Sequence, residues 1–395
     1  MHPPGADTVV VRHGEIGVKS EQVRRKMEQR LYDHVQAILD DRDVPGTVEQ
    51  RRNRLYVHTD ESAVEAATEA VSDVFGVVSA SPAVVVDPEM DSICETLAAA
   101  ARDHYDGGSF AIDARRAGHA DEHEFTSEDL ERRGGSAVWD AVDFDPEVDL
   151  DDPDLTFYVE ARPDVAYVFL EKREGPGGLP LGTQEPMVAL VSGGIDSPVA
   201  AWRAMKRGIP VIPVYLDLGR YGGPDHRARA EATVSDLSRY APHHDMRLRV
   251  IPAGDAVERI ATSVEKDRML AFRRFMFRAA ERVARDENAV GIVTGEAVGQ
   301  KSSQTTANLA VTSEATTLPV HRPLLTADKT DITEQARAIG TYTESTIPAG
   351  CNRLAPSFPE TNADLDEVRE VEPDELFELA REAAASVEVT DPFEG

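Results

Sequence analysis

Residues 192–198, which read S-G-G-I-D-S-P, constrain the fold of this chain most, because they follow an apolar run and precede a helix pattern. The run, residues 187–191, is short and continuously apolar, as in a strand buried inside a parallel sheet. Pro198 suits the first turn of a helix, and Gly208 is the kind of residue that ends one. Strand, turn and helix in this order predict an open α/β sheet with the turn at its ligand-binding edge.

The turn is also suited to holding phosphate. Gly193 and Gly194 let backbone N–H groups approach an oxyanion closely, and Ser192 and Ser197 add hydroxyl donors. It is neither a Walker loop nor a dinucleotide-binding loop, because the Gly-Lys-Ser/Thr ending and the G-x-G-x-x-G spacing are both missing. Asp196 would repel bare phosphate unless Mg²⁺ bridges the two groups. The competing interpretation is a plain Gly-Ser turn between a strand and a helix.

Beyond residue 183 the pattern alternates regularly between strand and helix, which predicts a doubly wound parallel sheet. Breakers at residues 174–180 predict a linker, which we place at residues 174–182. Two smaller α/β units are expected before it, at residues 1–60 and 61–173. The main elements predicted for the last domain, residues 183–395, are strands at 187–191, 209–216, 247–251 and 289–294 and helices at 198–207, 228–240 and 269–285.

The acidic excess of this chain is better explained by the salt content of its surroundings than by the charge of a binding partner. With 42 basic and 72 acidic residues the formal net charge is −30, which by itself argues against binding to nucleic acid. Only seven of the basic residues are Lys, and Asp and Glu are spread along the whole chain. Such an acidic, Lys-poor surface keeps a protein hydrated in concentrated salt, so we interpret the charge as adaptation to a saline habitat. Local clusters of Arg remain candidates for contacts with an anionic partner.

Membrane and disulfide chemistry are not expected. The chain has no apolar run near the roughly 18 residues of a membrane helix, and its start lacks a basic region followed by an apolar core. A cytoplasmic location is therefore predicted. The two cysteines, Cys94 and Cys351, are too few for a disulfide scaffold or a cysteine-only metal site. The sequence leaves the oligomeric state open, with a homodimer among the options.

The motif S-G-G-x-D-S resembles the signature of the PP-loop ATP pyrophosphatases, which split ATP between its α and β phosphates and attach AMP to an oxygen of the acceptor. Further stretches narrow the resemblance: F-R-R-F-M-F-R at 272–278, T-G-E-A-V-G-Q-K-S-S-Q at 294–304, R-P-L-L-T-A-D-K at 322–329 and I-G-T-Y at 339–342. Together they resemble the tRNA 4-thiouridine synthetase family, also called tRNA sulfurtransferases. The resemblance implies a PP-loop domain that adenylates O4 of a uridine in tRNA, at position 8, and then replaces that oxygen with sulfur.

The resemblance also implies a nucleotide site. ATP is the expected cofactor, with Mg²⁺ bound through it beside Asp196, and Asp196 and Cys351 are the implied catalytic residues. Arg273 would neutralise phosphate charge, as adenylyl transfer requires, although a solvated helix face is an equal alternative for Arg273 and Arg278. The residues matched to ATP contacts are Leu190, Val191, Ser192, Gly193, Gly194, Ser197, Tyr215, Leu216, Arg273, Gly295 and Gln304.

The N-terminal half extends the resemblance over nearly the whole chain. H-G-E-I-G-V-K at 13–19 resembles the opening motif of the family, and F-A-I-D-A-R-R at 110–116 with residues 125–127 and 134–135 resembles a THUMP domain, an RNA-binding unit. The resemblance implies a ferredoxin-like unit at 1–60, a THUMP domain at 61–173 and tRNA as partner. Pairing with nearby carboxylates is the alternative for each cation. The candidate contacts to tRNA phosphates are Lys19, Arg51, Arg52, Arg54, Arg115, Arg116, Arg132 and Arg133.

Sulfur chemistry is assigned to Cys351, which aligns with the cysteine of the catalytic domain in the family and has Arg353 nearby to favour a thiolate. Without the alignment, a lone cysteine is more often an inert packing residue, as we expect for Cys94. Two features of relatives are missing: the rhodanese extension of bacterial members, and the second cysteine of a C-x-x-C pair, where Leu354 stands. An iron–sulfur cluster is therefore not expected. The sulfur donor is left open between sulfide and a persulfide from a separate cysteine desulfurase.

Two other functions compete with tRNA thiolation. Sulfur supply for the thiazole of thiamine uses the same chemistry, although the THUMP-like half favours RNA. A tRNA-binding protein without catalysis is the third hypothesis, and the intact loop at 192–198 together with Cys351 speaks against it.

Overall fold

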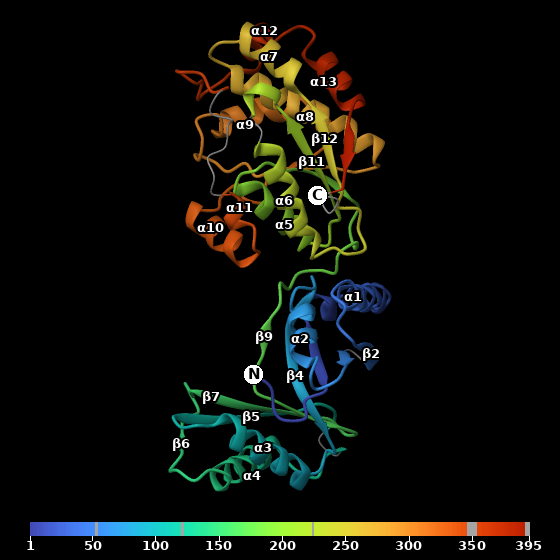
Figure 1. Cartoon of the computed structure of the whole chain (residues 1–395), viewed down its shortest axis with the longest axis vertical. Coiled ribbons are helices and arrows are strands. Elements are labelled where there is room, and N and C mark those ends of the chain that lie inside the picture. Colours follow the sequence, from blue (N-terminus) through green and yellow to red (C-terminus); the bar gives the residue numbers. More distant parts are fainter. Residues whose placement is uncertain (52–53, 120–121, 223–224, 346–353, 392–395) are drawn as a thin grey trace. The chain divides into compact units, whose positions relative to one another are not determined.

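The structure, a computed structural model, describes residues 1–51, 54–119, 122–222, 225–345 and 354–391. Cys351 and Arg52, two of the predicted functional residues, lie outside these ranges. The chain divides into two compact units, residues 1–180 and residues 181–395, and each is described by itself (Figure 1).

The first half of unit 1 is an α+β arrangement of four strands and two long helices. Outward and inward residues alternate along the strands, so that Val9 and Val11 of β1 pack against the helices together with Leu55 and Val57 of β3. A single helical turn, η1 (Glu15–Val18), follows β1. The elements are β1 (Thr8–His13), α1 (Glu21–Asp41), β2 (Thr47–Arg51), β3 (Arg54–His58), α2 (Val64–Ser72) and β4 (Val77–Val86).

The second half of unit 1 adds two helices and further strands to the same sheet. Its strand order is β2-β3-β1-β4-β8-β7-β5-β6, and β9 also pairs with β4. The long strand β4 therefore joins the two halves, because β1 pairs along one part of it and β8 along the other. The added elements are α3 (Met90–His104), β5 (Ser109–Arg116), α4 (Ser127–Asp140), β6 (Glu147–Val148), β7 (Leu155–Ala161), β8 (Ala166–Phe169) and β9 (Arg173–Glu174).

Packing places helix α2 with the first half of unit 1 rather than the second. Val64, Ala67 and Val71 are buried in the same apolar cluster as Val9 of β1. The domain boundary predicted after residue 60 would separate α2 from the strands that it covers. A change of composition along the sequence does not reveal which strands a helix packs on. We therefore propose a first boundary within or just after β4, while the continuous sheet keeps both halves in one compact unit.

Unit 2 is a doubly wound sheet, as the alternation of strands and helices predicts. Its order is β14-β13-β10-β11-β12-β15, with the first five strands parallel and β15 antiparallel at the edge. The strands are β10 (Met187–Leu190), β11 (Val211–Asp217), β12 (Leu248–Pro252), β13 (Ile292–Val293), β14 (Val320–His321) and β15 (Glu388–Thr390). The helices include α5 (Asp196–Met205), α6 (Asp225–Ser238), α7 (Gly254–Ser263), α8 (Arg268–Asp286), α9 (Thr306–Ser313), α10 (Lys329–Ala338), α12 (Leu365–Val371) and α13 (Leu376–Ala385).

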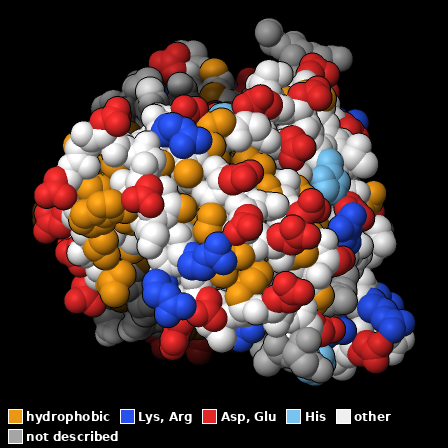
Figure 2. Space-filling model, turned by 90° about the horizontal axis from the view of Figure 1, so that it is seen from below, with side chains coloured by type: hydrophobic (Ala, Val, Ile, Leu, Met, Phe, Trp, Pro, Cys, Tyr) orange, Lys and Arg blue, Asp and Glu red, His pale blue; other side chains and the backbone are white. Residues whose placement is uncertain are grey.

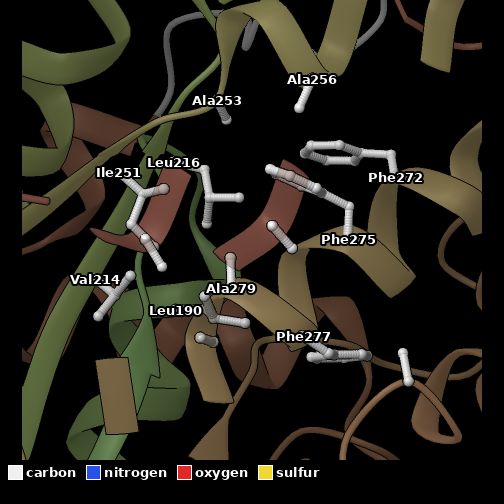
Figure 3. Packing of buried hydrophobic residues seen from close by; sticks show 14 of the residues in the cluster. Leu190, Val214, Leu216, Ile251, Ala253, Ala256, Phe272, Phe275, Phe277 and Ala279 are labelled. Atoms are coloured by element: carbon white, nitrogen blue, oxygen red, sulfur yellow. The ribbon is translucent and has the colours of Figure 1, made fainter. Parts of the chain in front are cut away.

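Helix α8 carries the core of unit 2. Phe272 and Phe275 point from it toward Leu216 and Ala256, and Phe277, two residues after Phe275, is buried in the same cluster (Figure 3). Burying large aromatic side chains against the β-branched and Leu residues of the strands is the main apolar contribution to the stability of such a domain. The packing fixes the start of α8 beside the carboxyl ends of the strands, where the phosphate loop lies.

Several elements differ from the sequence patterns. The strand predicted at 289–294 is only two residues long, and helices α4, α7, α9 and α10 are not predicted at all. The helix predicted at 198–207 begins two residues earlier, with Asp196 in its first turn. Gly208 follows α5 with a φ of 82°, as its expected role at the end of the helix requires. None of the described helices combines the length and apolar character needed to cross a membrane.

Candidate active site

The loop after β10 is closed by its own serines. The backbone N–H of Ser192 donates to Oγ of Ser197 at 2.9 Å, and that hydroxyl donates to the carbonyl of Ser192 at 3.1 Å. The N–H of Gly194 points to Oγ of Ser192 at 3.4 Å. These bonds curl residues 192–197 over the first turn of α5, whose free N–H groups and dipole favour an anion. The loop thus has the form of a phosphate cradle.

The cradle lies where the strand order reverses. β11 and β12 follow β10 on one side of it, and β13 and β14 lie on its other side, so that β10 and β13 flank the switch point of the sheet. Ligands of open α/β sheets bind at that point, outside the carboxyl ends of the strands. Residues 192–197 follow β10 and residues 294–296 follow β13, so both predicted motifs meet at this edge.

Gly295 and Gly193 allow the surrounding elements to close on the loop. A Cβ atom on Gly295 would lie 2.8 Å from the carbonyl carbon of Asp196 and from the nitrogen of Ser197, both of which are backbone atoms. On the other side, a Cβ on Gly193 would lie 2.9 Å from Cβ of Arg229 in α6. The loop is held between two close backbone approaches, which only glycine permits without displacement.

Glu296, the residue after Gly295, is a buried carboxylate that holds two arginines. It is 3% exposed, forms an ion pair with Arg273 of α8, and accepts from Nε of Arg322 at 2.8 Å. Burial lowers the pKa of Arg322. The network fixes the guanidinium of Arg273, which is nearly buried, so the solvated helix face that we weighed for Arg273 does not occur.

Gln304 joins the same network. With its amide oriented to satisfy its neighbours, Gln304 donates to the carbonyl of Ala297 at 2.9 Å and accepts from Arg273 at 3.1 Å. Gln304 is itself mostly buried. The structure therefore connects three residues that the sequence analysis matched to ATP contacts, Arg273, Gly295 and Gln304, around Glu296.

Lys329 brings a second charge to the loop. Its ammonium group donates to Oδ1 of Asp196 at 2.6 Å, and both side chains are partly exposed. Lys329 is the first residue of α10, far along the chain from Asp196. Lys329, Glu296 and Arg322 lie within the matched stretches, but the sequence predicts no role for them. A charged residue directly after a strand, as at Glu296, is the signal that could have identified this network.

The remaining matched positions line the same edge from inside. Leu190 ends β10 and Val191 follows it, Tyr215 and Leu216 lie near the carboxyl end of β11, and all four are buried. Val191 donates through its N–H to the carbonyl of Val214 at 2.9 Å, which continues the sheet up to the loop. These residues form the apolar floor beneath residues 192–197.

The candidate tRNA contacts fall on two faces of unit 1. In β5, Arg115 lies on the face away from the helices, whereas Arg116 lies on the helix face and donates to the carbonyl of Phe125 at 2.8 Å. Arg132 and Arg133 belong to α4 and pair with Asp129 and Asp91. Each of these pairs is exposed and contributes little to stability. Of the others, Arg51 and Arg54 lie on the helix-free face, and Lys19 follows η1.

Of the two cysteines, the structure describes only Cys94. Cys351 lies outside the described residues, so its role stays a prediction. Leu354 is buried in the core of unit 2. Cys94 is half-buried in α3, where burial raises the pKa of its thiol, which disfavours the reactive thiolate.

A cavity of about 470 Å³ lies elsewhere in unit 2. Its walls include Arg278, Glu281, Arg285 and Phe377 of α8 and α13, with Thr317 just ahead of β14. Because β14 is parallel to β13, Thr317 marks the amino-terminal edge of the sheet, opposite the phosphate loop. The cavity shares no residue with the loop.

Comparison with known proteins supports the same arrangement. A family model described as ThiI ferredoxin-like domain matches residues 8–81, a THUMP domain model matches residues 88–171, and a model described as Thiamine biosynthesis protein (ThiI) matches residues 182–377. A crystal structure of a 4-thiouridine synthetase in complex with RNA and bound ATP is similar with a TM-score of 0.84 and 29% identity, and covers 98% of this chain and 100% of that one. The structure of PH1313 from Pyrococcus horikoshii is similar with a TM-score of 0.65 and 26% identity, over 85% and 99% of the two chains.

Curated relatives match over almost their whole length. A probable tRNA sulfurtransferase of Halobacterium salinarum is 62% identical over 396 residues, which cover 100% of this chain and 99% of the relative. A probable tRNA sulfurtransferase of Methanosarcina acetivorans is 42% identical over 366 residues, which cover 91% of this chain and 87% of the relative. With all three domain models in order and such identity over the full length, this chain belongs to the tRNA sulfurtransferase (ThiI) family.

Proposed function

We propose that this chain is a cytoplasmic ATP-dependent tRNA sulfurtransferase that converts a uridine of tRNA, at position 8, to 4-thiouridine. The observation that carries the proposal is the phosphate cradle at the switch point of unit 2, closed by Gly295 and flanked by Arg273 and Lys329. Family membership supports the substrate, since a similar solved protein is a 4-thiouridine synthetase in complex with RNA and ATP.

The first step is adenylation. O4 of the uridine attacks the α-phosphorus of ATP, the new O–P bond forms as the bond to the β-phosphate oxygen breaks, and pyrophosphate leaves. Backbone N–H groups in the first turn of α5 bind the phosphates, and Lys329 supplies positive charge beside Asp196 for the departing pyrophosphate. Arg273, fixed by Glu296, neutralises further charge without having to reorganise during the reaction.

Mg²⁺ fits this site as a partner of the phosphates. Among the described residues no three His, Cys, Asp or Glu side chains gather into a metal site, so the ion would be held mainly by ATP, with Asp196 as a protein ligand. When bound, Mg²⁺ supplies positive charge to the phosphates. Asp196 would then exchange Lys329 for the ion, which leaves the ammonium group available to phosphate oxygens.

The second step replaces oxygen with sulfur. A sulfur nucleophile attacks C4 of the adenylated uridine, the C4–O bond breaks, and AMP leaves with the oxygen. We propose Cys351 as the cysteine that attacks, carries the sulfur or resolves a disulfide, with sulfide or a persulfide from a cysteine desulfurase as the source. Its position in the catalytic domain of a sulfurtransferase family supports this role.

The test is mass spectrometry of tRNA nucleosides from a deletion strain complemented with the wild type, Asp196→Ala or Cys351→Ser. We expect 4-thiouridine to disappear in the deletion, to return with the wild type and to stay absent in both variants. Persistence of 4-thiouridine in the deletion strain would contradict the proposed function. Its return with Cys351→Ser alone would contradict only the sulfur step.

A second candidate is sulfur supply for the thiazole of thiamine. The observation that favours it is the family model at residues 182–377, which is described as a thiamine biosynthesis protein. Growth of the deletion strain without thiamine separates the two functions, because a chain that serves only tRNA is dispensable for that growth.

A further inference from the structure

All four long helices of unit 1 lie on one face of its nine-stranded sheet. Helices α1 and α2 cover Val9 and Val57, and α3 and α4 cover Ile112 and Val159. The pairing register keeps these residues on the same side from β3 through β4 to β5. The alternate residues therefore form a face that no described helix of unit 1 covers. We call it the open face. Its outward residues on the longer strands include Arg51, Arg54, Tyr56, Val10, Arg12, Ser81, Ala83, Tyr167, Phe169, Tyr158, Glu160, Asp113 and Arg115.

Aromatic rings form the centre of the open face. Tyr56 stacks on Tyr167 with ring centroids 5.0 Å apart, and Tyr158 stacks on Phe169 at 5.2 Å. The two pairs come from β3, β8 and β7, and they share one apolar cluster with Val10. Tyr56, Tyr167 and Phe169 are each at most 2% exposed, so the rings form a rigid, buried base that holds the charged side chains above them.

Cations lie over this aromatic base. Arg12 sits over the ring of Phe169 at 4.7 Å, Lys172 over Tyr158 at 3.6 Å, and Arg162 over Tyr56 at 5.9 Å. Burial lowers the pKa of Arg12 to about 10, so this guanidinium remains charged at neutral pH.

One buried carboxylate serves three of these cations. Glu160 pairs with Arg54, with Arg162 at 2.9 Å and with Arg12 at 3.5 Å. Burial alone would raise the pKa of Glu160, but the attraction of the three guanidinium groups is larger and lowers the pKa below its usual value. One negative charge against three positive ones leaves net positive charge at the centre of the open face.

This charge stands against the rest of unit 1. Residues 1–180 contain 18 basic and 39 acidic side chains. On the face seen in Figure 2, carboxylates are spread throughout and Lys and Arg are scattered. The charged groups of the open face, with those at its rim, include Arg12, Arg51, Arg54, Arg115, Arg162 and Lys172 against Glu49, Asp113, Glu160, Asp164 and Glu174, so positive and negative charge are close to balanced there while unit 1 as a whole is strongly acidic.

A cavity of about 270 Å³ adds a concave site to this surface. It is lined by Arg51, Tyr56, Arg162 and Tyr167, with Asp164 and Val165 at the turn between β7 and β8. Its walls thus combine guanidinium groups, which bind phosphate, with the edges of two phenol rings that are themselves at most 2% exposed.

We propose that the open face is the surface on which unit 1 binds the RNA backbone, and that Arg132 and Arg133 on the helix face do not take part. The inference rests on the proposed function, since it names the RNA-binding surface of the same enzyme. Charge complementarity selects the partner: a sheet face rich in guanidinium groups, in an otherwise strongly acidic unit, fits the phosphate backbone of a polyanion. Of the tRNA contacts predicted from the sequence, Arg51, Arg54 and Arg115 belong to this proposed surface.

The test compares two triple variants of the full chain. The face variant is Arg51→Gln, Arg115→Gln and Lys172→Gln, which avoids the three arginines on Glu160 and so leaves no buried carboxylate unpaired. The control is Arg25→Gln, Arg132→Gln and Arg133→Gln, which removes the same charge from exposed helix positions. Binding of tRNA is measured over a salt series. Circular dichroism and ATP binding check that each variant folds.

We expect the face variant to weaken tRNA binding by about tenfold or more and to lower the slope of log affinity against log salt by about two, since each lost phosphate contact removes roughly 0.7–0.9. The control should match the wild type. An equal loss of tRNA affinity in both variants, or a loss in the control alone, would overturn the proposal that the open face binds the RNA backbone. If the face variant misfolds, the single change Arg115→Glu at a highly exposed side chain replaces it, with the same expected direction. A wild-type chain that binds no tRNA would overturn the proposed function itself, which the other outcomes leave standing.

Discussion

At the scale of single residues, Gly295 holds the candidate site together by having no side chain. A methyl group there would meet backbone atoms of Asp196 and Ser197 at 2.8 Å, and backbone in a helix turn cannot move aside as a flexible side chain can. We expect Gly295→Ala to lower the free energy of unfolding by roughly 1–3 kcal/mol and to weaken ATP binding. Urea unfolding and ATP titration measure the two effects.

The matched control for Gly295 is Gly254→Ala. Gly254 begins α7 in the same unit, and a Cβ atom there would have its nearest neighbour at 3.5 Å, an ordinary contact. The control should keep both stability and ATP affinity. Equal behaviour of the two variants would show that the close approach at Gly295 is not what shapes the loop.

Lys329 is the residue whose role depends most on the fold. It lies beside Asp196 only because α10 begins next to the loop. We expect Lys329→Met to reduce tRNA-dependent release of pyrophosphate by about 100-fold or more, the usual cost of losing one fixed charge donor in the transition state. Lys206→Met is the control, because Lys206 lies at the opposite end of α5 over Trp202. A wild-type rate in Lys329→Met would exclude this contact from catalysis.

At the scale of elements, Glu281 ties α8 to the segment ahead of β14. Burial alone would raise its pKa, but hydrogen bonds from Thr317 and Arg285 lower the pKa to about 2, against an ordinary value of 4.5. A lowered folded-state pKa stabilises the protein above the unfolded value and loses that contribution as pH falls. The stability advantage of the wild type over Glu281→Gln should therefore shrink between pH 4.5 and about 2.

Urea unfolding of both proteins at several pH values checks this. Glu378→Gln serves as the control, because Glu378 is an exposed carboxylate of α13 paired only at the surface. A constant difference between the wild type and Glu281→Gln across the whole range would contradict the assigned role.

Elements with a strong local pattern could be predicted from the sequence, and those made by pairing could not. Strand β10 is a continuous apolar run and α8 has a clear helical period, so both were predicted within two residues. Strands β14 and β15 are only two or three residues long and exist because their neighbours bond to them. No local pattern marks such strands.

The candidate site shows the same division. The glycines and serines at 192–197 reveal a phosphate loop by themselves, because backbone chemistry and spacing are local. The ion pairs of Glu296 with Arg273 and Arg322 and of Lys329 with Asp196 join residues 23, 26 and 133 positions apart. Only the switch point of the sheet brings these side chains together.

At the scale of the whole molecule, the net charge of −30 makes folding stability depend on salt, in the direction opposite to tRNA binding. Repulsion among carboxylates destabilises the compact state at low ionic strength, and added salt screens it, with a screening length near 10 Å at 0.1 M that falls to about 3 Å at 1 M. Binding of a polyanion weakens as salt rises. Folding and tRNA binding should thus respond to salt in opposite directions.

We therefore expect the thermal midpoint of unfolding to rise between about 0.2 M and about 3 M KCl, while tRNA affinity falls over the same range. Thiolation should pass through a maximum, because at low salt too little protein is folded and at high salt too little tRNA is bound. The Arg51, Arg115 and Lys172 triple variant should move that maximum to lower salt, since fewer phosphate contacts remain. Its thermal midpoint should follow the wild-type curve or lie slightly below it. Melting curves and 4-thiouridine formation across a KCl series measure both. A midpoint that falls with salt would show that the acidic surface does not need screening, and a rate without a maximum would show that tRNA binding is not limited by backbone charge.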